Sequence, residues 1–274
     1  MVRERVSDNV YVFTSELYAQ VNAGAIVGPD WSVVIDTLAY PEETNEIRDF
    51  LENRLESPVR YVINTHHHAD HTLGTCWFSD VIVISHSLCR QLLENKGRKA
   101  LREAQRLNRE LWDVHVISPD IIFSEGGISL KVGKRTLKLV HLPGHSEDGI
   151  GVLLVEDRVL FSGDIMMPLP YIVDGDFDVM IESLKRIPQM TLENLVQGHG
   201  EVILRGEVGS VVKDNLDYLA TIRRHVKKAA RRRDPEGYLA KIDVESCGKS
   251  RILLNGLAED LHMRNLYALL DRMQ

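Results

Sequence analysis

Four histidines and one aspartate fall within residues 65–71, and no other stretch constrains the fold and chemistry of this chain as strongly. The segment follows a short apolar run at 61–63, which we expect to form a buried strand. In an extended backbone, side chains at i and i+2 point to the same side of the chain. His66 and His68 should therefore converge, while His67 should point away from them.

Asp70 and His71 follow where the chain is expected to turn, so an Asp–His pair lies just beyond the two converging imidazoles. Imidazole and carboxylate ligands together suit zinc, iron or manganese. A histidine-rich surface loop is the alternative interpretation of the segment. The spacing His-x-His-x-Asp-His at the end of a buried strand instead favours a site for two metal ions.

Three later residues that can bind metals come directly after strand-like apolar runs, and each has glycine beside it: His145, Asp164 and His199. Glycine permits the tight turn that aims a neighbouring side chain. Taken alone, each of these segments would be read as an ordinary turn. Together with the cluster at 65–71, they predict a single site assembled from several strand ends.

The order and spacing of these residues resemble the signature of the metallo-β-lactamase fold superfamily over roughly residues 10–205. The resemblance implies an αββα sandwich with two metal ions at the edge between its sheets. Three histidines would hold the first ion, one aspartate and two histidines the second, and a further aspartate would bridge them. The ligands of the first ion would be His66, His68 and His145, and those of the second Asp70, His71 and His199. The bridging aspartate would be Asp164. Asp36 matches a supporting residue behind the ligands.

Apolar β-branched runs and amphipathic stretches predict alternating strands and helices with the sheets at the centre, an α/β fold. Strands are expected at 10–13, 23–27, 33–35, 61–63, 81–84, 121–123, 128–132, 137–140, 152–155, 159–161 and 195–196. Helices are expected from 41 and over 87–108, 177–186, 212–226 and 257–273. A hinge near 231–237 would separate a metallo-β-lactamase fold domain, 1–233, from a small C-terminal helical extension, 234–274.

The chain of 274 residues has a net charge of −7 and three widely spaced cysteines, which suits a reducing cytosol. The negative charge argues against a nucleic-acid partner. A basic run at 223–233 lacks interleaved aromatic residues for base stacking, so we interpret it as a solvated helix face. Neither a signal peptide nor a membrane helix is indicated. We therefore expect a cytoplasmic protein without a membrane partner; the sequence leaves the oligomeric state open.

The resemblance implies a dinuclear metal-dependent hydrolase, since bound metal lowers the pKa of water to about 7. Zinc is the expected metal, with iron or manganese as alternatives. A hydroxide bridging the two ions would attack an ester, thioester or lactone-type carbonyl of a small molecule, and Asp70 would be the catalytic residue that orients it. A bridging Asp164 favours the broad glyoxalase II–like branch. A phosphodiesterase or nuclease of the same fold and an iron-dependent oxidoreductase are the alternatives.

The segment 165–176 begins beside Asp164 and is apolar, but its prolines and Gly175 argue against a regular strand or helix. We expect this loop to line the substrate pocket, with Tyr171 as a polar contact beside the ligands. Tyr18 could face the loop from the opposite side. The alternative is that the loop packs beneath the C-terminal helices as ordinary core.

Overall fold

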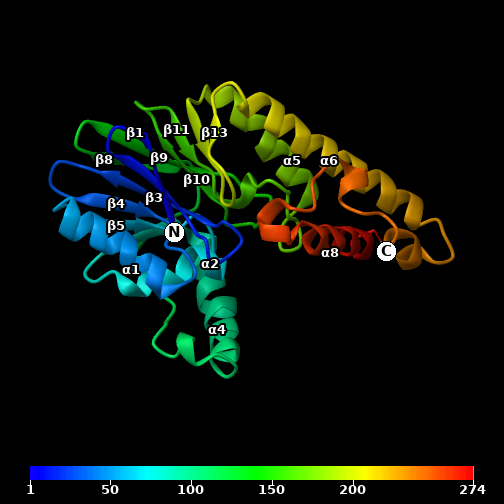
Figure 1. The fold of residues 1–274 in the computed structure, drawn as a ribbon, viewed down its shortest axis with the longest axis horizontal. Coiled ribbons are helices and arrows are strands. Elements are labelled where there is room, and N and C mark those ends of the chain that lie inside the picture. Colours follow the sequence, from blue (N-terminus) through cyan, green and yellow to red (C-terminus); the bar gives the residue numbers. More distant parts are fainter. Residues whose placement is uncertain (274) are drawn as a thin grey trace.

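The computed structural model of the chain describes residues 1–273 and contains two β-sheets packed between layers of helices (Figure 1). The strands of the first sheet lie in sequence order: β1 (Val2–Ser7), β2 (Val10–Thr14), β3 (Asn22–Val27), β4 (Ser32–Ile35), β5 (Val59–Ile63), β6 (Ile82–His86) and β7 (Ile121–Phe123). Strands β1 to β4 are antiparallel, whereas β4 to β7 run parallel. The carboxyl ends of β4, β5 and β6 therefore meet at one edge of the sheet.

The second sheet is mainly antiparallel and has the order β13-β12-β11-β10-β9-β8. Its strands are β8 (Gly127–Val132), β9 (Arg135–His141), β10 (Ile150–Leu154), β11 (Val159–Phe161), β12 (Asn194–Val196) and β13 (Ile203–Leu204). Strands β11 and β12 form its parallel pair, so their carboxyl ends also lie next to each other.

Consecutive side chains of a strand point to opposite faces of its sheet, and in the central strands each face packs into a hydrophobic core. These strands therefore appear in the sequence as continuous apolar runs. In β11, Val159 and Phe161 face the first sheet, while Leu160 faces the helices on the other side. In β5, Ile63 lies between the sheets and Val62 packs on the outer side of the first sheet. Burial of both faces fixes the register of the central strands.

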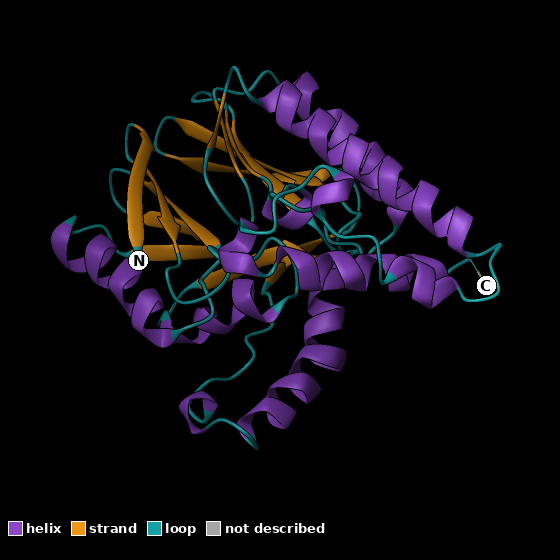
Figure 2. Ribbon diagram, turned by 45° about the vertical axis from the view of Figure 1, so that its right-hand side comes forward, coloured by secondary structure: helices purple, strands orange, loops and turns teal. Residues whose placement is uncertain are grey.

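Helices cover the outer face of each sheet, as Figure 2 shows. Helix α1 (Pro41–Asp49) packs on the first sheet through Ile47, whereas α5 (Phe177–Arg186) and α6 (Val208–Ala229) pack on the second sheet. This layering confirms the predicted αββα sandwich. No helix within residues 1–273 is both long enough and apolar enough to cross a membrane.

The C-terminal segment continues the core of the second sheet. Helices α7 (Pro235–Leu239) and α8 (Ala258–Asp271) contribute Leu239 and Leu266 to the same cluster as α5 and α6. The division at residue 233 stays a prediction, and Gln274, the last residue of the predicted extension, lies outside the described residues.

An arm of short helices projects from the first sheet between β6 and β7, and its α4 points away from the sandwich (Figure 1). It consists of α3 (Ser87–Leu92), a wider turn η3 (Leu93–Gly97) and α4 (Arg98–Gln105). The sequence predicts one helix reaching residue 108, but α4 ends at Gln105 and the chain turns back. The sequence does not predict edge strand β1, because its charged and exposed side chains give little apolar signal.

Candidate metal centre

Four of the seven ligand candidates come from the carboxyl end of β5 in the first sheet. The chain stays extended through His68, which has φ −64° and ψ 148°, and then enters the short helix α2 (Ala69–Thr72). His66 and His68 therefore precede the helix, while Asp70 and His71 lie within its first turns. This change from extended to helical backbone places all four side chains on one side of the segment.

The other three candidates come from loops of the second sheet. His145 follows β9, Asp164 lies in the turn η5 (Gly163–Ile165) after β11, and His199 follows β12. Gly163 has a φ of +55°, a conformation that most L-residues avoid, at the start of that turn. At position 198, an added Cβ would lie only 1.7 Å from Asp164 Oδ1, so glycine is required beside His199.

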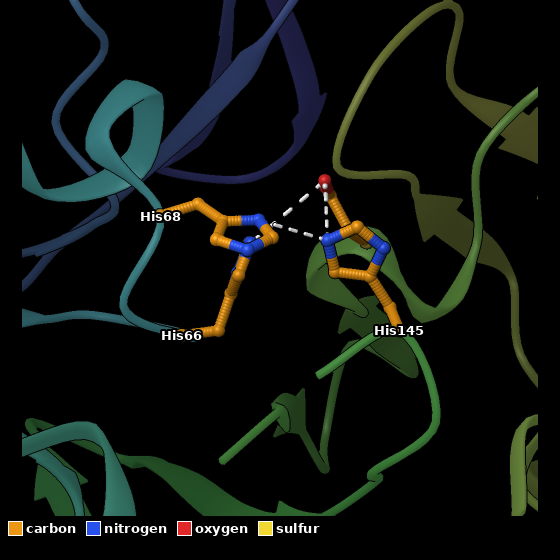
Figure 3. A group of neighbouring side chains, drawn as sticks. His66, His68 and His145 are labelled. Atoms are coloured by element: carbon orange, nitrogen blue, oxygen red, sulfur yellow. Dashed lines mark hydrogen bonds and ion pairs between the residues drawn. The ribbon is translucent and has the colours of Figure 1, made fainter. Parts of the chain in front are cut away.

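Three histidines and Asp164 form the first group of donors, and Figure 3 shows its histidines facing one another. Asp164 Oδ2 lies 3.3 Å from His145 Nε2 and 3.8 Å from His66 Nε2. His68 Nδ1 lies 3.0 Å from His145 Nε2. The facing atoms of this group all lie within 4.8 Å of one another.

Asp70, His71 and His199 form the second group, again with donor atoms within 4.8 Å of one another. His199 Nε2 lies 3.3 Å from Asp70 Oδ2 and 3.4 Å from Asp164 Oδ2. His71 Nε2 lies 3.2 Å from Asp164 Oδ1. Asp164 therefore touches both groups, and the structure brings together all seven residues that the sequence singled out.

The remaining ring nitrogens of these histidines bind fixed acceptors that orient the rings. His145 Nδ1 donates to the carbonyl of Tyr171 at 2.8 Å, and His199 Nδ1 donates to the carbonyl of Ala19 at 2.9 Å. These bonds place the proton on Nδ1 and leave Nε2 facing the centre, the arrangement that metal-binding imidazoles need.

Asp36 supports two of the candidate ligands from behind. Its carboxylate accepts bonds from the main-chain N–H of Thr65 at 2.8 Å, from Thr65 Oγ1 at 2.7 Å and from His71 Nδ1 at 3.0 Å. Thr65 Oγ1 in turn lies 3.0 Å from His66 Nδ1. A single buried carboxylate thus holds one histidine of each group, in the supporting position expected from the sequence.

His68 has the opposite orientation, with Nδ1 facing the centre and Nε2 lying 3.2 Å from Asp174 Oδ2. The hydrogen bond to His68 lowers the pKa of Asp174 to about 2. The sequence places Asp174 in the loop after Asp164 but predicts no role for it. The sequence does not show which histidine an acidic loop residue will contact in the folded protein.

The donor set fits divalent metal ions. Within residues 1–273, His66 Nε2, His71 Nε2 and Asp164 Oδ1 are buried polar atoms that make no well-aligned hydrogen bond. Buried polar atoms are seldom left in this state, and orphaned donors around a carboxylate are typical of a place where a ligand completes the contacts. Five imidazoles and two carboxylates make up the set, and both are ligand types that zinc and iron use.

Burial lowers the pKa values of these histidines, whereas the neighbouring carboxylates raise them. Burial lowers the pKa of His145 to about 4. Burial also acts against an imidazolium at His71 and His199, but the negative charges of Asp164 and Asp70 outweigh it. They raise the pKa of His199 to about 10 and raise the pKa of His71 well above its ordinary value. These protons have to leave when a cation binds to the same nitrogens.

The loop that supplies Tyr171 and Asp174 is fastened by the C-terminal helix α8. Asn265 Nδ2 donates to the carbonyl of Pro170 at 2.7 Å, and its Oδ1 accepts from the N–H of Ile172 at 2.9 Å. Arg272 donates to the carbonyls at positions 172 and 173 at 2.9 and 2.8 Å. The C-terminal segment therefore fixes two groups that orient His145 and His68.

Tyr171 contributes its main-chain carbonyl, which accepts the hydrogen bond from His145. Its half-buried ring has its centroid 6.0 Å from that of the His145 ring. Its predicted role as a polar contact for substrate stays a prediction. Tyr18 is 42% exposed, and burial together with the charge of Asp70 raises the pKa of its hydroxyl. Tyr18 is therefore near the second group, and its expected place opposite the 165–176 loop stays a prediction.

His67 points away from the centre, as the alternation of an extended segment predicts. Its Nδ1 lies 3.1 Å from Oδ1 of Asp148, whose side chain is fully buried. Burial acts to raise the pKa of Asp148, but the bond and charge of His67 outweigh it and lower that pKa. His67 is therefore the partner of a buried carboxylate outside the two donor groups.

The two neighbouring histidines should respond differently to truncation. His67→Ala should retain metal but lose about 3 kcal/mol of unfolding free energy, because Asp148 stays buried without its partner. The double variant His67→Ala/Asp148→Asn should recover part of that loss. His68→Ala should lose metal from the first group. Urea unfolding and elemental analysis measure both effects, and equal metal loss in the two single variants would contradict the assignment.

A variant of α8 should weaken metal binding from a distance. Asn265→Leu removes both hydrogen bonds to the loop, so Tyr171 and Asp174 lose their fixed positions, and we expect roughly tenfold weaker zinc binding. Tyr218→Phe is the matched control, because the Tyr218 hydroxyl binds Asn265 and His262 without touching the loop. Zinc titration of folded protein should separate the two. Equal affinity in both variants would disprove a positioning role for Asn265.

Comparison with known proteins shows which family the chain belongs to. The sequence profile of the Metallo-beta-lactamase superfamily matches residues 18–207. The chain is 30% identical over 154 residues to the acyl-coenzyme A thioesterase MBLAC2 of Gallus gallus, covering 50% of this chain and 55% of that protein. It is 24% identical over 223 residues to the Homo sapiens protein of the same name, covering 71% and 79%.

The beta-lactamase-like protein 2 homolog of Caenorhabditis elegans is 27% identical over 147 residues, covering 54% of this chain and 44% of that protein. The chain thus spans about half the length of the nematode and chicken relatives.

Solved structures agree on the fold. A metallo-beta-lactamase from Pontibacter korlensis superposes with a TM-score of 0.63 at 20% identity, covering 77% of this chain and 98% of that one. The sec-alkylsulfatase Pisa1 from Pseudomonas gives a TM-score of 0.73 at 17% identity, covering 98% of this chain and 50% of that one. Together with the two-sheet layering and the profile match, these findings confirm the recognition made from the sequence: the chain belongs to the metallo-β-lactamase superfamily.

Proposed function

We propose that this protein is a dinuclear metal-dependent hydrolase that cleaves an ester, thioester or lactone-type carbonyl bond. The observation that carries the proposal is the arrangement of seven donors in two groups that share Asp164. His66, His68 and His145 would hold one ion, and Asp70, His71 and His199 the other. Zinc is the proposed metal because imidazole and carboxylate ligands suit it, while iron and manganese are alternatives.

A pair of divalent ions at this site would supply hydroxide at neutral pH and polarise a carbonyl oxygen. The chain's own residues would orient the reactants. Asp70 lies next to His199, and its carboxylate would accept a proton from the attacking water. Asp164, between the two groups, would hold their separation constant. In hydrolysis of a thioester, a C–O bond to the water oxygen forms, the C–S bond breaks, and the thiolate leaves.

Similarity favours a small acyl compound as substrate. The names of the chicken and human relatives describe acyl-coenzyme A thioesterases. We propose a thioester or ester for this chain on that basis, and a cytoplasmic location is consistent with its three free cysteines. A phosphodiesterase and an iron-dependent oxidoreductase use the same fold, and metal analysis with an absorption spectrum distinguishes the iron enzyme.

The direct experiment supplies purified protein with zinc and assays a panel of ester, thioester, lactone and phosphodiester substrates. Turnover of a carbonyl substrate, its loss after chelation and its return on adding zinc would support the proposal. Turnover confined to the phosphodiester, or none with any metal tested, would contradict it.

Asp164 provides a sharper test of the shared carboxylate. Asp164→Asn keeps the shape of the side chain but removes the charge between the two groups, so both metal content and activity should fall, activity by at least a hundredfold. Asp148→Asn is the matched control, since Asp148 is equally buried and bound to a histidine but belongs to neither donor group. If Asp164→Asn retained both ions at unchanged affinity, the shared role would be wrong.

A further inference from the structure

A separate cavity of about 340 Å³ lies between the histidine segment and the arm formed by α3, η3 and α4. Most of its lining is apolar, including Leu93 and Leu101 from the arm and Leu111 from the short turn after α4. Small-molecule sites usually measure about 300–1,000 Å³ and have this mixture of apolar walls with a few polar groups. The cavity is at the lower end of that range, which suits a narrow ligand better than a polycyclic one.

The space exists because the residues on one face of the arm have small side chains. Gly97, Ala100 and Ala104 all line the cavity, at spacings of three and four residues along the chain. This spacing places them on one side of a helix. Larger side chains at these positions would fill the space that the leucines enclose.

The cavity adjoins the candidate metal centre at His68. His68 lines its wall and also belongs to the first donor group, while Asp174, which holds His68, lines it as well. A molecule whose scissile carbonyl lies at the centre could therefore extend directly past His68 into the apolar space.

We propose that this cavity binds the unbranched apolar chain on the acyl side of the substrate, and so makes the enzyme a hydrolase of medium-chain acyl compounds. This inference rests on the proposed function. The acyl side is favoured because the thiol carriers of biological thioesters are polar or charged, and burying such a group against leucines would be costly. An acyl chain gains stability from the same surroundings.

A chain-length series tests the assignment directly. N-acetylcysteamine thioesters of two to ten carbons share one leaving group, and each methylene buried should raise kcat/KM by up to about fourfold until the cavity is full. The increase between butyryl and octanoyl would be on the order of a hundredfold. The reverse series, acetyl thioesters of alkanethiols of increasing length, should show little dependence. A dependence confined to the reverse series would overturn the proposal.

Ala100→Phe should fill the cavity and reduce the preference for octanoyl over butyryl by at least about tenfold. Ala220→Phe is the matched control: Ala220 is likewise exposed on a helix, but on α6 and outside the cavity lining. Ala104→Leu provides a second filling variant if Ala100→Phe does not fold. An unchanged chain-length preference in a folded filling variant would overturn the proposal.

Binding of decanoate, measured by calorimetry on zinc-loaded protein, separates this inference from the proposed function. Decanoate should bind at least tenfold more weakly to Ala100→Phe than to Ala220→Phe. If no thioester is hydrolysed but this difference is found, the cavity assignment stands and the hydrolase proposal fails. If thioesters are hydrolysed without dependence on acyl length or on Ala100, the hydrolase proposal stands and the cavity assignment fails.

Discussion

The buried carboxylate of Asp36 is the contact on which the candidate centre depends most. At the end of β4, with φ +57°, it binds the main chain and side chain of Thr65 and the ring of His71. It therefore sets the path of the chain where β5 ends and fixes histidines of both donor groups. Loss of this one group would disturb the backbone and the ligands together, which is why its cost of burial is tolerated.

Asp164 links the histidines that Asp36 holds to the candidate ligands of the second sheet. The first sheet supplies four candidate ligands and the second supplies three, and Asp164 from the second sheet faces histidines of both. The C-terminal helix adds a further layer of support, because Asn265 fixes the loop behind His145 and His68. The cavity beside His68 lies against the arm, and Asp174 of that loop forms part of its wall.

The sequence revealed the parts whose signal is local. A run of apolar residues marks a buried strand, and His-x-His-x-Asp-His marks a candidate ligand segment within six residues, so the fold class and the candidate ligands could be predicted. The contacts of Asp174 and Asn265, and the carbonyls of Tyr171 and Ala19, depend on segments that meet only after folding. Carbonyl acceptors in particular have no sequence signal, since every residue carries one.

The most direct test of the account is a crystal structure of zinc-loaded protein measured at the zinc absorption edge. We expect two anomalous peaks per chain, one among His66, His68 and His145 and the other among Asp70, His71 and His199, with Asp164 between them. A single peak, with His71 and His199 remote from it, would contradict a dinuclear centre.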